Sequence, residues 1–170
     1  MNDHRILLRR ARPDEGPQLA QIAAEAYGKY VGQLAEPPAP LLLDYDEVAR
    51  AGRTHVAEDA AGLLGMVTVE PGSPHFVLRN LAVRPASQGK GIGRLLVALV
   101  EDLARTADQQ GVRLWTRTEM SDNIAFYKSL DYVVTHFEQT AEASRVFLCK
   151  DWDQAQIGGL AIHAHNEPAR

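Results

Sequence analysis

The chain has 170 residues, of which 45% are hydrophobic and 24% charged, which is typical of a globular domain rather than a disordered or membrane protein. Its net charge of −4 argues against non-specific binding of nucleic acid and would not hinder a cationic amine as substrate. A single cysteine, Cys149, cannot form an internal disulfide, and no apolar signal core or membrane-spanning run is present. We therefore expect a cytoplasmic protein.

The N-terminal half alternates between strand and helix patterns. Apolar periodicity predicts a strand, a helix with Asp14 as its N-cap and an apolar face ending at Tyr27, a proline-rich turn and a short helix. Two further strands across a glycine turn are typical of a hairpin. In order, these elements lie at residues 5–9, 14–27, 37–40, 45–51, 54–58 and 63–70.

The C-terminal half carries one strand–helix–strand crossover, then a helix and a final pair of strands. Its long helix begins near Gly91 and is closed by Gly111. These elements lie at residues 75–83, 91–110, 112–116, 122–130, 132–136 and 145–150. Antiparallel hairpins together with one crossover predict an α/β sandwich with a mixed sheet.

The chain divides into one domain and a tail. Residues 1–153 are long enough to bury a single core, whereas residues 154–170 show no periodicity and are expected to be poorly ordered. Two tail histidines, His163 and His165, lack cysteine or carboxylate partners at ligand spacing. We therefore expect no metal site.

A glycine-rich loop between the fourth strand and the long helix is the most informative part of the sequence. Gly89, Gly91 and Gly93 stand at alternate positions and remove side chains from the loop. The helix that follows offers free N–H groups and the positive end of its dipole. The loop is therefore suited to hold an anion such as a pyrophosphate, although a plain glycine turn before a helix is the alternative.

The glycine spacing fits neither of two common phosphate-binding loops. A Walker loop needs glycine where the chain has Arg84 and serine or threonine where it has Gly91. A dinucleotide fingerprint needs its third glycine at Arg94. ATP and NAD are therefore poor matches.

Two motifs instead resemble the GNAT superfamily of acyl-CoA-dependent N-acetyltransferases. Gln88-x-x-Gly91-x-Gly93 resembles its acyl-CoA loop, and an asparagine followed by an aromatic–tyrosine pair at residues 123–127 resembles its second signature. Together the motifs cover residues 77–133. The resemblance implies a three-layer sandwich whose mixed, mostly antiparallel sheet splays between its fourth and fifth strands, with the pantetheine arm of acetyl-CoA between them.

The resemblance also implies which residues bind acetyl-CoA. Backbone groups of Leu81 and Val83 would hold the pantetheine amides, and residues 88–94 would hold the pyrophosphate. The implied set is Leu81, Ala82, Val83, Gln88, Gly89, Lys90, Gly91, Ile92, Gly93, Arg94, Asn123 and Phe126. Tyr127 would lie near the sulfur as a hydrogen-bond or proton donor. The alternative is that Tyr127 is a half-buried core tyrosine whose hydroxyl contacts solvent.

One departure from the family pattern concerns the general base. The family often places a carboxylate at the position of Asn80, and an amide cannot accept the proton of the acceptor amine. Glu119, just past the fifth strand, is our first candidate base, acting through a water, although it could equally be a solvent-facing loop carboxylate. Glu70 and His75 are weaker candidates. A second departure, Asp131 in place of glycine, is acceptable as a left-handed C-cap.

The implied reaction is attack of a neutral amine on the acetyl thioester through a tetrahedral intermediate. A different function stays open because Asn80 replaces the carboxylate: the chain could be a non-catalytic acyl-CoA-binding or sensor module. For an enzyme, the acceptor could be a small amine or a peptide amine. The oligomeric state, monomer or homodimer, is not indicated by the sequence.

Overall fold

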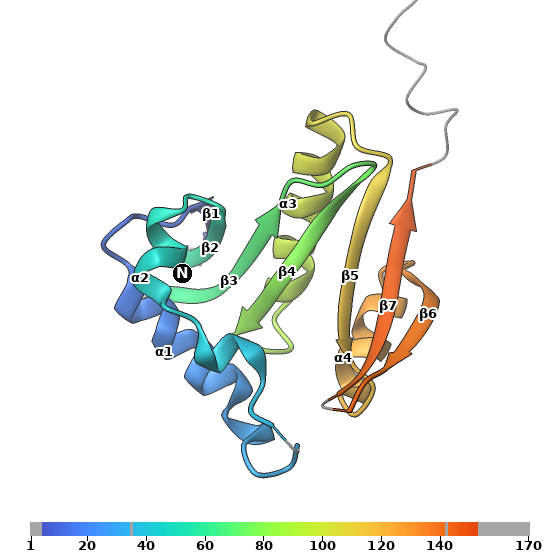
Figure 1. Cartoon of the computed structure of the whole chain (residues 1–170). Helices are drawn as coiled ribbons and strands as arrows, with labels where there is room; N and C mark the ends of the chain where they lie inside the picture. The colour runs from blue at the N-terminus through green and yellow to red at the C-terminus, as the bar shows by residue number, and fades with distance from the viewer. Residues whose placement is uncertain (1–4, 35, 142, 153–170) are drawn as a thin grey trace, which may run out of the picture.

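The computed structural model describes residues 5–34, 36–141 and 143–152, whose strands form one mixed sheet flanked by helices (Figure 1). The strands are β1 (Leu7–Arg10), β2 (Thr54–Asp59), β3 (Gly62–Glu70), β4 (His75–Val83), β5 (Gly111–Arg117), β6 (Val133–Gln139) and β7 (Ser144–Asp151). The helices are α1 (Gly16–Tyr27), α2 (Tyr45–Arg50), α3 (Ile92–Thr106) and α4 (Ser121–Lys128), with 3₁₀ turns at Gly28–Tyr30, Ala39–Leu42 and Pro85–Ser87. None of these helices is both long and apolar enough to cross a bilayer.

The sheet order is β1-β2-β3-β4-β5-β7-β6, and every neighbouring pair except β4–β5 is antiparallel. β4 and β5 are paired only where residues 75–77 meet residues 111–113. Beyond this contact the two strands diverge, and a gap opens between them (Figure 1). The expected mixed, mostly antiparallel sheet that splays between its fourth and fifth strands is thus confirmed.

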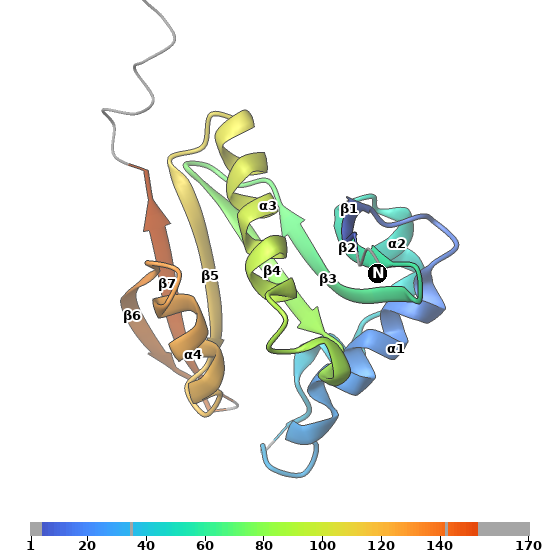
Figure 2. The same ribbon diagram turned by 180° about the vertical axis from the view of Figure 1, so that it is seen from behind.

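The helices cover the two faces of the sheet. α3 and α4 lie on one face, and α1 and α2 lie on the other, beside the N-terminal strands (Figures 1 and 2). α3 buries a stripe at helical spacing against the sheet, whereas α1 buries Leu19 and Ile22 in a second core on the opposite face. The stripe of α3 consists of Ile92, Leu96, Val97, Val100 and Ala104.

A β-bulge in β4 decides which side chains reach each face. The register with β3 shifts by one residue and leaves Arg79 as an extra residue of β4. Before the bulge, Leu78 packs in the core under α3. After it, Ala82 packs in the core under α1, and Asn80, two residues earlier, shares that face. The bulge therefore aims Asn80 toward α1.

Two expected element boundaries are wrong. α1 begins at Gly16, and Asp14 does not cap it; the carboxylate of Glu15 instead accepts hydrogen bonds from the guanidinium of Arg9. α3 ends at Thr106 rather than at Gly111, which belongs to β5. Asp131 adopts a left-handed φ of 68° after α4, as expected for a C-cap. The tail at 154–170, with its two histidines, lies outside the described residues, so the domain division stays a prediction.

Candidate active site

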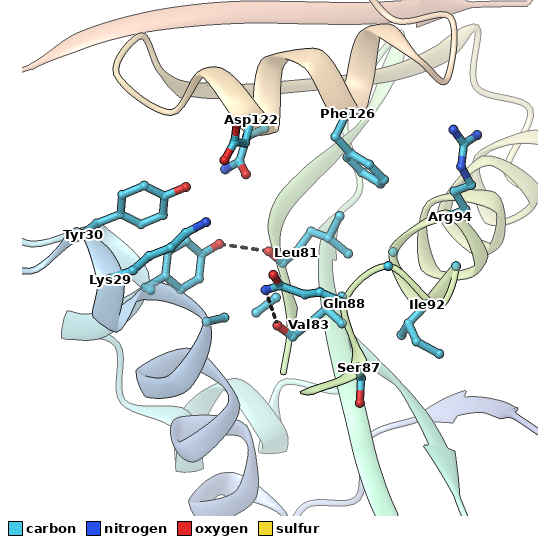
Figure 3. Close-up of a pocket in the computed structure, with 17 residues that line it drawn as sticks. Lys29, Tyr30, Leu81, Val83, Ser87, Gln88, Ile92, Arg94, Asp122 and Phe126 are labelled. Atoms are coloured by element: carbon cyan, nitrogen blue, oxygen red, sulfur yellow. Dashed lines mark hydrogen bonds between the residues drawn. The ribbon is translucent and has the colours of Figure 1, made fainter. Parts of the chain in front are cut away.

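A cleft of about 390 Å³ opens where β4 and β5 separate (Figure 3). Its walls come from β4, the glycine-rich loop, the first turns of α3 and α4, and the C-terminal end of α1. The lining residues are Ala26, Tyr27, Lys29, Tyr30, Leu81, Ala82, Val83, Ser87, Gln88, Gly89, Gly91, Ile92, Gly93, Arg94, Asp122, Asn123 and Phe126.

The β4 wall presents backbone carbonyls to the cleft rather than to β3. The Tyr27 hydroxyl lies 3.0 Å from the Leu81 carbonyl oxygen, and the Gln88 side-chain amide donates to the Val83 carbonyl at 3.0 Å (Figure 3). The N–H of Arg84 points the other way and donates to β3. Because alternate residues of a strand direct their backbone groups to the same side, Leu81 and Val83 share this edge.

The glycine-rich loop has the conformation that its composition permits. Gly89 and Gly91 have left-handed φ values of 73° and 83°, and a Cβ at either would meet no described atom within 4 Å. Gly91 is the N-cap of α3, and no described side chain bonds to that cap. The first N–H groups of α3 are therefore available to an anion from the cleft. Lys90 belongs to the loop but is not among the described residues that line the cleft.

Gly93, unlike Gly89 and Gly91, does not have a left-handed φ, so glycine is needed there for space and not for backbone conformation. A Cβ on Gly93 would lie 3.1 Å from the ring of Phe126. The missing side chain therefore lets α4 approach the first turn of α3 and narrows the cleft at this point. Asn123, one helical turn before Phe126, lies on the same wall.

Tyr127 lies behind this wall and is only 6% exposed. Its ring packs edge-on against Phe126 at 5.2 Å and against Tyr132 at 5.7 Å between centroids. Burial raises the pKa of the Tyr127 hydroxyl well above its usual value, so the group stays protonated. It can donate a hydrogen bond, but its raised pKa makes it a weaker acid than an exposed tyrosine, and the protonated group cannot serve as a base at neutral pH.

Asn80 is buried between two tyrosines. Its side-chain oxygen lies 2.7 Å from the Tyr27 hydroxyl, and its amide nitrogen lies 3.4 Å from the Tyr45 hydroxyl. Burial raises the pKa of the Tyr45 hydroxyl to about 12. Burial also raises the pKa of the Tyr27 hydroxyl, and the nearby hydroxyls of Tyr127 and Tyr45 add to that rise. The network therefore holds two neutral hydroxyls against the side-chain amide of Asn80.

None of the expected general bases is among the described residues that line the cleft. Glu119 is exposed and accepts a hydrogen bond from the adjacent Thr118 at 3.2 Å. Glu70 pairs with arginines, and His75 pairs with Asp151. Both line a separate cavity on the C-terminal half of the sheet. Among the described residues that line the cleft, Asp122 is the only carboxylate.

Residues from the end of α1 were missed by sequence reasoning. Tyr27 fits the apolar face of the helix, which suggested a core role, yet its hydroxyl reaches the edge of β4. Lys29 and Tyr30 follow in the adjoining 3₁₀ turn, with the Lys29 ammonium 4.9 Å from the ring centroid of Tyr30. The clustering of two tyrosines and a lysine just past a helix end was the available signal. Ala26, Ser87 and Asp122 were missed too.

Comparison with known proteins agrees with this geometry. Residues 50–134 match the family model described as the acetyltransferase (GNAT) domain. Similar solved structures include the PaiA N-acetyltransferase of Thermoplasma acidophilum in complex with coenzyme A, with 17% identity, a TM-score of 0.71, and coverage of 87% of this chain and 99% of that one. No curated protein sequence matches the chain significantly.

Two further solved structures have the same fold. The ribosomal-protein-S18-alanine N-acetyltransferase of Escherichia coli has 16% identity and a TM-score of 0.68, with coverage of 86% of this chain and 94% of that one. YncA of Salmonella typhimurium, solved with acetyl-CoA, has 19% identity and a TM-score of 0.66, with coverage of 88% and 95%. At these identities the likeness is one of fold.

Proposed function

This chain belongs to the GNAT family of acetyltransferases, and we propose that it moves the acetyl group of acetyl-CoA to a primary amine. The observation that carries the proposal is the cleft beside β4, which combines a strand edge that is not paired with another strand and a glycine loop at a helix N-terminus. An extended amide chain ending in a pyrophosphate needs both features.

Different residues of the cleft would bind different parts of acetyl-CoA. Leu81 and Val83 would bind the pantetheine amides through their backbone, in place of the side chains of Tyr27 and Gln88 that they now contact. The loop residues 88–94 would bind the pyrophosphate. Asn123 and Phe126 would close the opposite side.

In the proposed reaction, the neutral amine attacks the thioester carbonyl, the carbon–nitrogen bond forms, and the carbon–sulfur bond of the tetrahedral intermediate breaks. The Val83 N–H would support the oxyanion, and the protonated Tyr127 hydroxyl would donate to the departing sulfur. Glu119, through a water, and Asp122, which lines the cleft, are the two carboxylates we propose for removal of the amine proton.

Two measurements on the full chain test the proposal. Calorimetry with CoA measures binding, and release of free thiol from acetyl-CoA, screened against pooled amines and peptides, measures transfer. We expect binding and amine-dependent thiol release. Binding without release for any acceptor would instead support the non-catalytic acyl-CoA-binding module that the Asn80 substitution allows. Absence of binding would overturn both.

A further inference from the structure

Three side chains with metal-ligating atoms meet on the sheet at the closed end of the splay. His75 begins β4 and is paired with Gly111 of β5, which is paired in turn with Asp151 at the end of β7. His75 and Asp151 are therefore separated by an intervening strand. Because the residue between them has no side chain, the imidazole and the carboxylate meet over it, with 2.5 Å between Nε2 and Oδ1.

Gly111 is required here for space rather than for backbone conformation. Its φ is not left-handed, and a Cβ would clash with the Lys150 carbonyl oxygen and would lie 2.9 Å from the Asp151 Cα and 3.0 Å from the Asp151 Oδ1. Any other residue would therefore clash with the backbone of β7 beside the meeting point of the two side chains. The sequence pattern predicted that Gly111 closes the long helix. Its position between His75 and Asp151 follows only from the strand pairing in the structure.

Cys149 supplies the third ligand atom. It lies two residues before Asp151 on β7, so both side chains point to the same face of the sheet. Its Sγ is 3.3 Å from the Asp151 Oδ1. The nitrogen, sulfur and oxygen ligand atoms of His75, Cys149 and Asp151 all lie within 4.8 Å of one another.

The order of these groups excludes a catalytic cysteine triad, in which a histidine lies between the thiol and the carboxylate. Here the carboxylate lies between the thiol and the imidazole. One ion bound to all three atoms would satisfy this arrangement instead. Zinc takes thiolate, imidazole and carboxylate ligands at about 2.0–2.3 Å in a tetrahedron, which separates neighbouring ligand atoms by about 3.3–3.8 Å.

We propose that His75, Cys149 and Asp151 bind a zinc ion that joins β4 to β7 across β5. Asp151 is 67% exposed, so its carboxylate can turn to its place around the ion, and a water can take the fourth position. The site lies where β4 and β5 still pair, outside the lining of the acetyl-CoA cleft. It rests on different residues from the proposed function and is no part of acetyl transfer. The sequence-based expectation of no metal considered only His163 and His165.

Cobalt titration of the reduced, metal-free full chain tests the site, because Co²⁺ reports thiolate ligation by a charge-transfer absorption band. We expect one equivalent to give the band and zinc to displace it. Cys149→Ser should abolish the band. His75→Ala and Asp151→Asn should weaken binding by more than the roughly 10–100-fold lost with a partner that merely orients a ligand. Asp151 is exposed, so its variant is expected to stay folded, which circular dichroism checks.

Removal of His163 and His165 together is the matched control, because these two histidines are close in sequence, lie outside the proposed site and could themselves attract the metal. Unchanged binding in this double variant is expected. Three results would each overturn the proposal: no thiolate band in the wild-type chain, a band that persists in Cys149→Ser, or binding lost with the tail histidines. Wild-type affinity in Asp151→Asn would overturn the three-ligand site as well.

Discussion

Asn80 owes its surroundings to a single inserted residue. Without the bulge at Arg79, alternation along β4 would place Asn80 on the face of Leu78, under α3. With it, the amide faces α1 and contacts the hydroxyls of Tyr27 and Tyr45. Nothing in the hydrophobic pattern of the strand signals the bulge, so the sequence identified the missing carboxylate but could not predict what surrounds the amide that replaces it.

Tyr127→Phe tests the donor role of the buried hydroxyl. The ring and its contacts with Phe126 and Tyr132 remain, so affinity for acetyl-CoA should be nearly unchanged. Loss of a donor to the leaving sulfur should lower kcat by about a hundredfold, the lower end for proton donation. Steady-state kinetics measure both quantities once an acceptor is known.

Tyr132→Phe is the control for this experiment. It removes another buried hydroxyl from the same aromatic group, yet Tyr132 is not assigned to the reaction. Its kcat should stay near that of the wild type. If the kcat of Tyr127→Phe is also within about threefold of the wild-type value, Tyr127 has only a packing role, because that ratio corresponds to less than one kcal/mol of activation free energy.

Among the elements, those with strong periodicity were predicted well and their ends were not. The stripe of α3 could be read from the sequence because its apolar residues recur at helical spacing. Asp14 is of a residue type that often caps helix N-termini, but Glu15 contacts Arg9 of β1, and α1 starts only after Glu15. Such ends depend on residues from other elements, which local patterns do not contain.

The junction of β1, β2 and α1 depends on one arginine. Arg9 pairs with Glu15 and Glu58, both at 2.6 Å, and these hydrogen bonds lower the pKa of each carboxyl. A lowered pKa stabilises the fold above the unfolded-state value, about 4.3, and this contribution is lost as pH falls through the folded-state pKa. We expect Glu15→Gln to reduce the free energy of unfolding by about 1.5–3 kcal/mol at pH 7.

Urea unfolding at several pH values measures this effect. The difference between Glu15→Gln and the wild type should begin to shrink below about pH 4.3, where the carboxyl group of the unfolded chain becomes protonated, and should approach zero as pH falls through the lowered folded-state pKa of Glu15. Glu138→Gln removes an exposed pair with Arg145 at 3.8 Å and should cost less than about 1 kcal/mol. A difference that is constant with pH would contradict the linkage.

Gly91→Val tests the loop as the pyrophosphate site. A β-branched side chain would enter the open space beside the cleft and oppose the left-handed φ. We expect CoA affinity to fall at least tenfold, about 1.4 kcal/mol. Gly52→Val is matched to it, because Gly52 also has a left-handed φ and open space but lies outside the cleft lining. Urea unfolding should show a similar loss of stability in the two variants, whereas calorimetry should show a loss of CoA affinity only in Gly91→Val. Equal CoA affinities in the two variants would place the phosphate site elsewhere.

At the scale of the whole molecule, the cleft follows from how the two parts of the sheet are joined. β4 and β5 share only three paired positions, and each is otherwise held by antiparallel neighbours on its far side. The strands can therefore separate without losing the rest of their hydrogen bonds. This arrangement was predicted through the family resemblance; the hairpins and single crossover alone indicated a mixed sheet but not where it would open (Figure 2).

A ligand that bridges the splay should stabilise the whole fold, because it contacts β4, α3 and α4 at once. Binding to the native state raises the free energy of unfolding by RT ln(1 + [L]/Kd), about 2.7 kcal/mol at a hundredfold excess of ligand over Kd. For a chain of this size, that corresponds to a rise in Tm of about 5–10 °C. We expect CoA and acetyl-CoA to give this rise in a thermal-shift assay, whereas NAD and ATP give little, because the glycine spacing fits neither of their loops. No rise with CoA, or an equal rise with ATP, would contradict a pantetheine-binding cleft, since ATP shares the adenosine 5′-diphosphate part of CoA but has no pantetheine arm to pair with the edge of β4.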